Sequence, residues 1–141
     1  MENPTFISFD SEKEGLVFDD SAHPLFPLKY FNLKGSFFSD KQKSYYGFVY
    51  DGQVILKSHS RPNDIILSDG MYFSSIGNFT INSIGGSYVI IEVDHNSSYY
   101  KQNNFSPMFT VGGPIEATGR MKYIDGCTDS VLINPIKMGD P

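Results

Sequence analysis

The chain has 141 residues, a formal net charge of −5, 15% aromatic residues and no Trp. This length predicts one ordinary domain, which can bury a sizeable core, and the single cysteine excludes a disulfide framework within the chain. The acidic balance argues against nucleic acid and against an anionic membrane surface as partners. No apolar run approaches the roughly 20 residues that span a bilayer.

The N-terminal region predicts an extended arm over residues 1–28. Its start has neither the basic region nor the apolar core of a signal peptide, so we expect a reduced, cytoplasmic protein. Residues 11–15 allow a single helical turn at most. Two prolines in residues 23–33 exclude a central strand at the start of that stretch. We expect it to pack on a sheet and then to enter a strand near 29–38.

The middle of the chain has apolar residues at period two, which predicts strands. These strands are expected near 44–50, 53–58, 63–67, 71–75, 78–82 and 87–93. Asp51-Gly52 between the first two predicts a two-residue type I′ hairpin turn, because both central residues of that turn take positive φ. Further turns are expected at Asp69-Gly70, Gly77-Asn78 and Gly85-Gly86, and residues 95–107 are the longest predicted loop.

The last third of the chain predicts four more strands, near 107–111, 115–117, 120–124 and 130–134. Gly112-Gly113-Pro114 is interpreted as a hairpin turn. Many short antiparallel strands without helices predict an all-β fold, a jelly roll or small antiparallel β-barrel, because closure protects strand edges. An Ig-like sandwich shares this turn spacing but lacks support from a Cys-Trp-Cys pattern.

Aromatic residues are the most abundant candidates for ligand binding. Tyr72 and Tyr88 lie in predicted strands, and a barrel mouth lined by such rings suits sugars or aromatic small molecules. Most such residues nevertheless fill cores. Arg120 could clamp a carboxylate through two hydrogen bonds, or it could pair with Glu116 or Asp125, which are close in sequence.

Cys127 has no basic residue beside it in the sequence, so nothing indicates the lowered pKa that a catalytic thiol needs. The surrounding DGCTDS stretch is more typical of a tight turn, with side chains bonding nearby backbone N–H groups.

Three stretches resemble the cupin superfamily, namely LFPLKYFNLKGSFF (25–38), KSHSRPNDIILSDGMYFSS (57–75) and residues 108–141. The first and last resemble the N-terminal half of bacterial two-domain cupin (bicupin) proteins, in which a GRxxYIDGCTDS stretch lies between the halves. The resemblance implies a cupin-like barrel over 29–118 and a connector over 119–141 that leads to a missing second barrel. Alternatively, the chain is a complete single-domain cupin whose last strand is 130–136.

Metal-bearing cupins, by this resemblance, supply two closely spaced His, a Glu and a later His, a donor set suited to Fe, Mn, Ni or Zn. The chain departs from that pattern, because Arg61 stands two residues after His59. The nearest substitute set is His59, Asp64 and His95, with Asp69 as a further carboxylate. The simpler interpretation of His59 is a solvent-facing residue at the end of a strand.

We therefore expect a degenerate, metal-free cupin-type barrel with no cofactor and no catalysis of its own. It would be the structural or small-molecule-binding half of a larger cupin protein, with a second barrel in cis or in a homodimer. The ligand would be a small organic acid or a sugar, and the candidate binding residues are His59, Tyr72, Tyr88 and Arg120.

Two alternatives stay open. One is a metal-dependent dioxygenase, isomerase or lyase of small organic acids that uses His59 with Asp64 or Asp69 and His95. The other is a carbohydrate-binding module that uses tyrosine faces, although it lacks Trp, the commonest stacking residue.

Overall fold

The computed structural model describes residues 8–94 and 108–133, which form strands and no helix. No part of these ranges could therefore cross a membrane as a helix. The strands are β1 (Gly15–Asp20), β2 (Leu28–Leu33), β3 (Phe37–Phe38), β4 (Ser44–Asp51), β5 (Gln53–Ser58), β6 (Ile65–Ser68), β7 (Tyr72–Ile76), β8 (Phe79–Ser83), β9 (Ser87–Val93), β10 (Thr110–Gly112), β11 (Met121–Ile124) and β12 (Cys127–Asp129).

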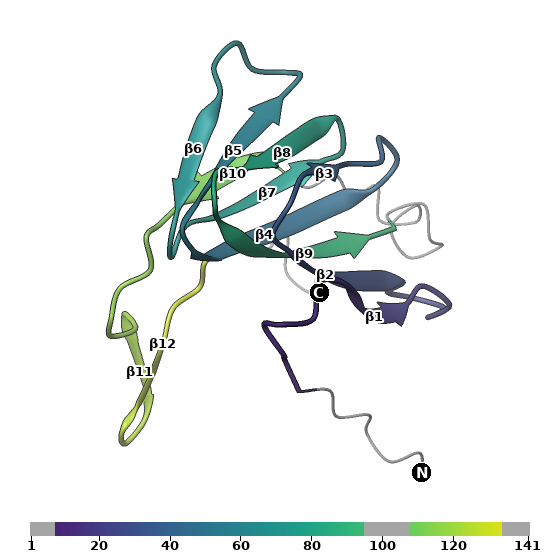
Figure 1. The fold of residues 1–141 in the computed structure, drawn as a ribbon. Coiled ribbons are helices and arrows are strands. Elements are labelled where there is room, and N and C mark those ends of the chain that lie inside the picture. Colours follow the sequence, from purple (N-terminus) through teal and green to yellow (C-terminus); the bar gives the residue numbers. More distant parts are fainter. Residues whose placement is uncertain (1–7, 95–107, 134–141) are drawn as a thin grey trace.

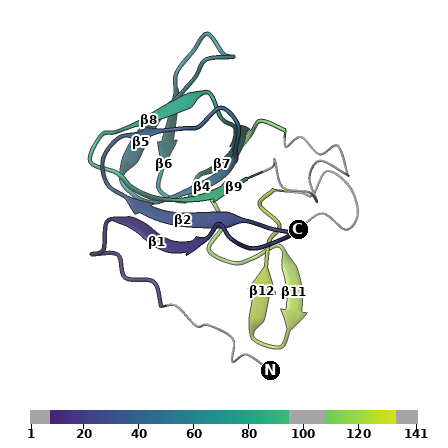
Figure 2. The ribbon, with the colours of Figure 1, turned by 90° about the vertical axis from the view of Figure 1, so that its right-hand side faces the viewer.

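Two antiparallel sheets face each other and enclose the core (Figure 1). The larger sheet has the strand order β1-β2-β9-β4-β7-β10 and the smaller has the order β3-β8-β5-β6. From β2 to β5 and from β6 to β9, consecutive strands alternate between the two sheets, which is the pattern of a jelly roll. The predicted all-β, jelly-roll fold is confirmed. Figure 2 shows the barrel from the side, with β11 and β12 below it.

The predicted hairpin at Asp51-Gly52 is wrong. β4 pairs with β7 and β9 in the larger sheet, whereas β5 pairs with β6 and β8 in the smaller. Only Gly52 has positive φ, +67°, so the turn is a corner between sheets rather than a type I′ turn. A Cβ on Gly52 would lie 2.7 Å from the carbonyl oxygen of Gly85, so this corner also requires close backbone approach.

The N-terminal region contains a strand that the sequence analysis missed. β1 pairs with β2 at the edge of the larger sheet, and the helical turn expected at 11–15 is a backbone turn in which the Lys13 N–H donates to Asp10 O. The segment before β1 is held by the buried Asn32, whose Nδ2 donates to Ser11 O and Lys13 O. The predicted arm therefore contributes a strand to the larger sheet.

The C-terminal strands also differ from the prediction. No strand forms at 115–117, because Gly113 has φ of +101° and the Ile115 N–H donates to Gly70 O, which directs the chain onto the β6–β7 turn. The predicted hairpin at Gly112-Gly113-Pro114 is consequently wrong. β11 and β12 pair with each other around Asp125-Gly126, so the second strand is 127–129 rather than 130–134.

The core between the two sheets is rich in aromatic rings. Tyr45 and Phe73 each contact Phe79 edge to face, with ring centroids 5.2 and 5.4 Å apart. Gly47 lies opposite Phe73 in the sheet, and its missing side chain leaves the space that the ring fills. The buried core comprises Tyr45, Val49, Val54, Leu56, Leu67, Phe73, Phe79, Ile81, Tyr88 and Ile90.

Candidate functional site

The proposed metal ligands do not gather in the described part of the chain. His59 is exposed after β5, where its N–H donates to Asn78 O, and Asp64 pairs with Lys57 at 3.7 Å. His95 lies outside the described residues. Within 8–94 and 108–133, no three His, Cys, Asp or Glu side chains form a group that could hold a metal ion. The described donors thus do not fit a metal centre, and the set with His95 stays a prediction.

Tyr88 lies in the core rather than at a surface. It is 1% exposed, and its hydroxyl donates to Gly35 O at 2.6 Å. Burial raises the pKa of Tyr88 well above the ordinary tyrosine value.

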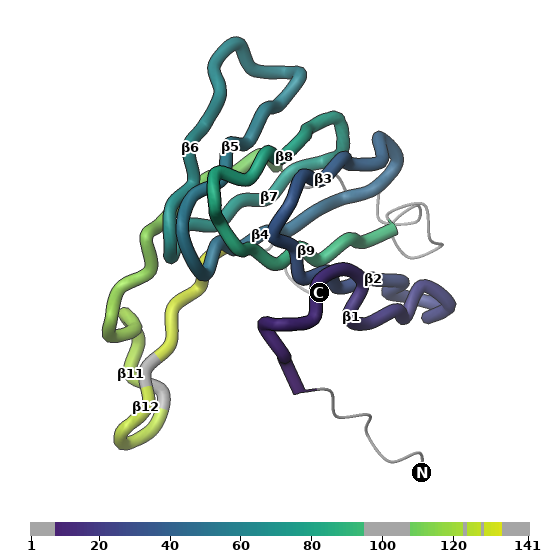
Figure 3. The backbone as a smooth tube through the Cα atoms, viewed as in Figure 1, coloured from purple at the N-terminus to yellow at the C-terminus, as the bar shows by residue number. Residues whose placement is uncertain are grey.

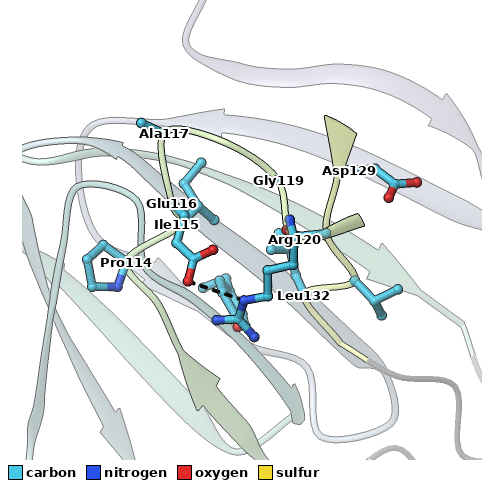
Figure 4. A pocket seen from close by; sticks show the side chains of 11 residues that line it. Pro114, Ile115, Glu116, Ala117, Gly119, Arg120, Asp129 and Leu132 are labelled. Carbon is cyan, nitrogen blue, oxygen red and sulfur yellow. Dashed lines mark hydrogen bonds and ion pairs between the residues drawn. The ribbon is translucent and has the colours of Figure 1, made fainter. Parts of the chain in front are cut away.

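Tyr72 and Arg120, in contrast, line one cleft on the barrel's flank (Figure 4). The cleft has a volume of about 370 Å³, which falls in the range of small-molecule sites. Its lining residues are Tyr72, Pro114, Ile115, Glu116, Ala117, Gly119, Arg120, Asp129, Ser130, Val131 and Leu132. Two of the four candidate binding residues are therefore brought together.

One wall of the cleft is built where β7 meets β10. Tyr72 pairs with Gly112, and a Cβ on Gly112 would lie 2.6 Å from the Tyr72 hydroxyl, so the ring packs directly on the glycine backbone. Gly113 then bends the chain with its positive φ and lies so close to Gly70 O that a Cβ would be 2.8 Å from it. These contacts fix the direction of the segment from Pro114 onward.

The other wall is formed at the base of the β11–β12 hairpin. A Cβ on Gly119 would lie 2.6 Å from Asp129 N and O, so the two backbones touch there. The Arg120 N–H donates to Ser130 Oγ at 2.9 Å. Figure 3 follows the chain from β10 down into this hairpin and back. The backbone of Arg120 is thus held in place while its side chain extends into the cleft.

Arg120 pairs with Glu116, as the sequence suggested, with Nε 3.3 Å from Oε1. Asp125 pairs instead with Lys122, at 2.9 Å. The Arg120 and Glu116 side chains are 69% and 54% exposed, so this ion pair contributes little to stability. The other arginine, Arg61, lies over the ring of Phe109 at 4.3 Å.

A buried polar cluster was missed by the sequence analysis. Glu92 on β9 accepts hydrogen bonds from Lys43 Nζ and from the Tyr45 hydroxyl, both at 2.9 Å. The Tyr45 hydroxyl accepts in turn from the Asp40 N–H at 2.7 Å. The available signal was the alternation along β9, which places Glu92 on the same face as the buried Tyr88 and Ile90.

Comparison with known proteins identifies the fold. No family model matches the chain, and no curated protein matches its sequence. A cupin protein from Bacteroides fragilis superimposes with a TM-score of 0.51 at 16% identity, over 69% of this chain and 89% of that one. An RmlC-like cupin protein from Desulfovibrio desulfuricans is less similar, with a TM-score of 0.42 and 12% identity over 67% and 96% of the two chains. The superposition on the Bacteroides fragilis protein shows that the chain has the cupin fold.

Proposed function

We propose that this chain is a metal-free cupin-type barrel without catalysis of its own, and that it serves as one half of a larger cupin assembly. The observation that carries the proposal is the filled interior of the barrel. Phe37, Tyr45 and Phe79 pack ring against ring, with centroids 5.2 to 6.2 Å apart. Together with Phe73 on Phe79, these rings occupy the space between the sheets.

The inward-facing carboxylate of Glu92 is also engaged. One of its oxygens accepts from Lys43 and the other from Tyr45. Because a buried charge must be neutralised and hydrogen-bonded, this cluster is accounted for by the stability of the fold. It supports a structural role for the polar end of the barrel rather than a catalytic one.

The β11–β12 hairpin supports association with a second barrel. Met121, Ile124 and Val131 are 47%, 57% and 54% exposed, and among the described strands β11 and β12 pair only with each other. A two-stranded hairpin of this size is marginally stable alone in water, so a second cupin barrel that covers these side chains would stabilise it.

The exposed, unpaired Cys127 supports a reducing compartment such as the cytoplasm.

Sedimentation of the purified chain at several concentrations tests the association. In the absence of a second barrel, the exposed hairpin should drive reversible dimerisation, and Ile124→Glu should weaken it. Ile66→Glu is the matched control, since Ile66 on β6 is equally apolar and 56% exposed but lies away from the hairpin. A chain that stays monomeric, or a dimer that only Ile66→Glu dissociates, would contradict the proposal.

A further inference from the structure

We propose that the cleft beside Tyr72 binds a small carboxylic acid with an apolar body, whose carboxylate replaces that of Glu116 on Arg120. This inference rests on the proposed function, since it assigns a ligand to a barrel that we regard as non-catalytic. The site lies outside the barrel interior, between the flank of the larger sheet and the base of the β11–β12 hairpin.

The lining of the cleft suits an apolar body with one charged end. Apolar and polar groups share the walls almost equally, and the apolar part is supplied by Tyr72, Pro114, Ile115, Ala117, Val131 and Leu132. Arg120 is the one cation among the lining residues. An apolar wall beside polar groups that fix orientation can hold a small molecule that has an apolar body and a charged end.

Arg120 has donors to spare for a ligand. Its guanidinium carries five N–H groups in a planar fork that matches a carboxylate, and the described contact with Glu116 uses Nε at 3.3 Å. The bond from the Arg120 backbone to Ser130 Oγ holds the root of the side chain. The guanidinium can therefore exchange one carboxylate for another without movement of the backbone.

Glu116 is an internal competitor for this position. It presents to Arg120 the same chemical group that the ligand would present, and Figure 4 shows the two side chains facing each other. The pair is largely exposed, so its exchange costs little. The carboxylate of Asp129, also in the lining, points away from the guanidinium in Figure 4.

The single cation favours a monoanion over other ligand classes. Lys122, the nearest lysine in sequence, is paired with Asp125 at 2.9 Å and does not line the cleft. A phosphate dianion would need more positive charge than one guanidinium that already contacts Glu116. A sugar carries no charge, so it would leave the charge of Arg120 unused.

Isothermal titration with benzoate and hexanoate, and with their amides as uncharged probes, tests the inference on the full chain. At least one acid should bind, and neither amide should. Arg120→Gln should weaken acid binding at least about tenfold, because charge-assisted hydrogen bonds are lost. Glu116→Gln should tighten it by about two- to fivefold, the range expected for removal of an exposed competing ion pair.

Lys122→Gln and Asp125→Asn supply matched controls on the same hairpin. They make the same changes of net charge as Arg120→Gln and Glu116→Gln but alter a pair outside the cleft lining, so they should leave acid affinity unchanged. All four residues are more than half exposed, and equal thermal midpoints would show that each variant is folded.

Any one of several results would overturn the inference. They are absence of acid binding to the wild type and to Glu116→Gln, equal binding of the amides, undiminished binding to Arg120→Gln, and weakened binding to Glu116→Gln. Tightening by Asp125→Asn to the same extent would also overturn it, because the effect would then be general electrostatics. None of these results alters metal content or sedimentation, so this inference and the proposed function fail separately.

Discussion

At the scale of single residues, Glu92 is a buried carboxylate whose partners matter for stability. It is 9% exposed and faces the interior beside Tyr45, its cross-strand partner in β4. Lys43 approaches from just before that strand and completes the ion pair. A buried carboxylate that loses its partner keeps the desolvation cost without the compensating bond. Loss of either Lys43 or Tyr45 as a partner of Glu92 should therefore destabilise the barrel.

Lys43→Met should destabilise the fold by about 1–3 kcal/mol at pH 7. The hydrogen bond to Glu92 raises the pKa of Lys43, so its contribution is fully present below the ordinary lysine pKa of about 10.4 and is lost as the pH rises through the raised value. Urea unfolding of both proteins at pH 7, 9 and 11 checks this.

Lys34→Met is the control, because its pair with Glu12 spans 4.0 Å at the surface. A difference that persists undiminished at high pH would contradict the assignment.

Tyrosine ionisation gives a second test at this scale. Burial raises the pKa of Tyr45 and of Tyr88, so the folded chain keeps protons that the unfolded chain releases above about pH 10. Stability should therefore fall as the pH rises past that value. In a spectrophotometric titration, Tyr45 and Tyr88 should ionise only as the protein unfolds. Ionisation of all nine tyrosines near pH 10 in a protein that stays folded would rule out the buried placement.

At the scale of the elements, the glycine in the middle of β4 determines how the larger sheet packs. A Cβ on Gly47 would overlap the ring of Phe73 on the neighbouring β7. Gly47→Ala should therefore cost about 1–3 kcal/mol through overpacking, and Phe73→Leu should recover part of that loss in the double variant. Chemical unfolding of the three proteins measures the coupling.

Gly35→Ala is the control for this substitution, because the nearest atom to its Cβ would be Glu14 Oε1 at 3.7 Å. It should change stability far less than Gly47→Ala. Additive losses from Gly47→Ala and Phe73→Leu would show that the two positions are not in contact.

The alternation of apolar and polar residues was sufficient to locate most strands of the barrel, because successive side chains of a strand point to opposite faces of the sheet. It did not predict strand partners. Asp51-Gly52 carries a true signal for positive φ, yet a corner between sheets and a hairpin turn share that signal, and only long-range pairing distinguishes them. β1 was missed because Gly15 and the acidic Asp19-Asp20 weaken its strand pattern.

The cleft was predictable only in part for a similar reason. Tyr72 and Arg120 were each proposed from residue type, but 48 positions of chain separate them. Their meeting depends on Gly113, whose positive φ directs the chain across Gly70, and on the contact of Gly119 with the Asp129 backbone. A glycine in a sequence shows where another backbone can come close, but it does not show which segment comes close. A role of His59 or Tyr88 in ligand binding stays a prediction.

At the scale of the whole molecule, the described chain divides into a filled cupin-fold barrel and a hairpin that carries exposed apolar residues (Figures 1 and 2). The barrel's buried hydrophobic cluster comes from β4 to β9, whereas the cleft needs residues from both parts. Stability and ligand binding should therefore be separable.

A chain that ends at Ala117 should test this separation. It keeps every strand of the two large sheets but lacks Arg120 and the β11–β12 hairpin. We expect cooperative thermal unfolding to persist, while dimerisation and binding of the carboxylic acid are lost. A truncated chain that fails to fold would show that the hairpin is required for the stability of the barrel. A truncated chain that still binds the carboxylic acid would place the acid site elsewhere.

We propose that the barrel interior is a packed core rather than a metal centre. The most direct measurement is a metal inventory by plasma mass spectrometry on protein purified without chelators or an affinity tag, in the wild type and in His59→Ala. We expect transition-metal content far below one ion per chain, with no difference between the two proteins. A stoichiometric metal in the wild type that is lost in His59→Ala would contradict it and would favour the metal-dependent enzyme.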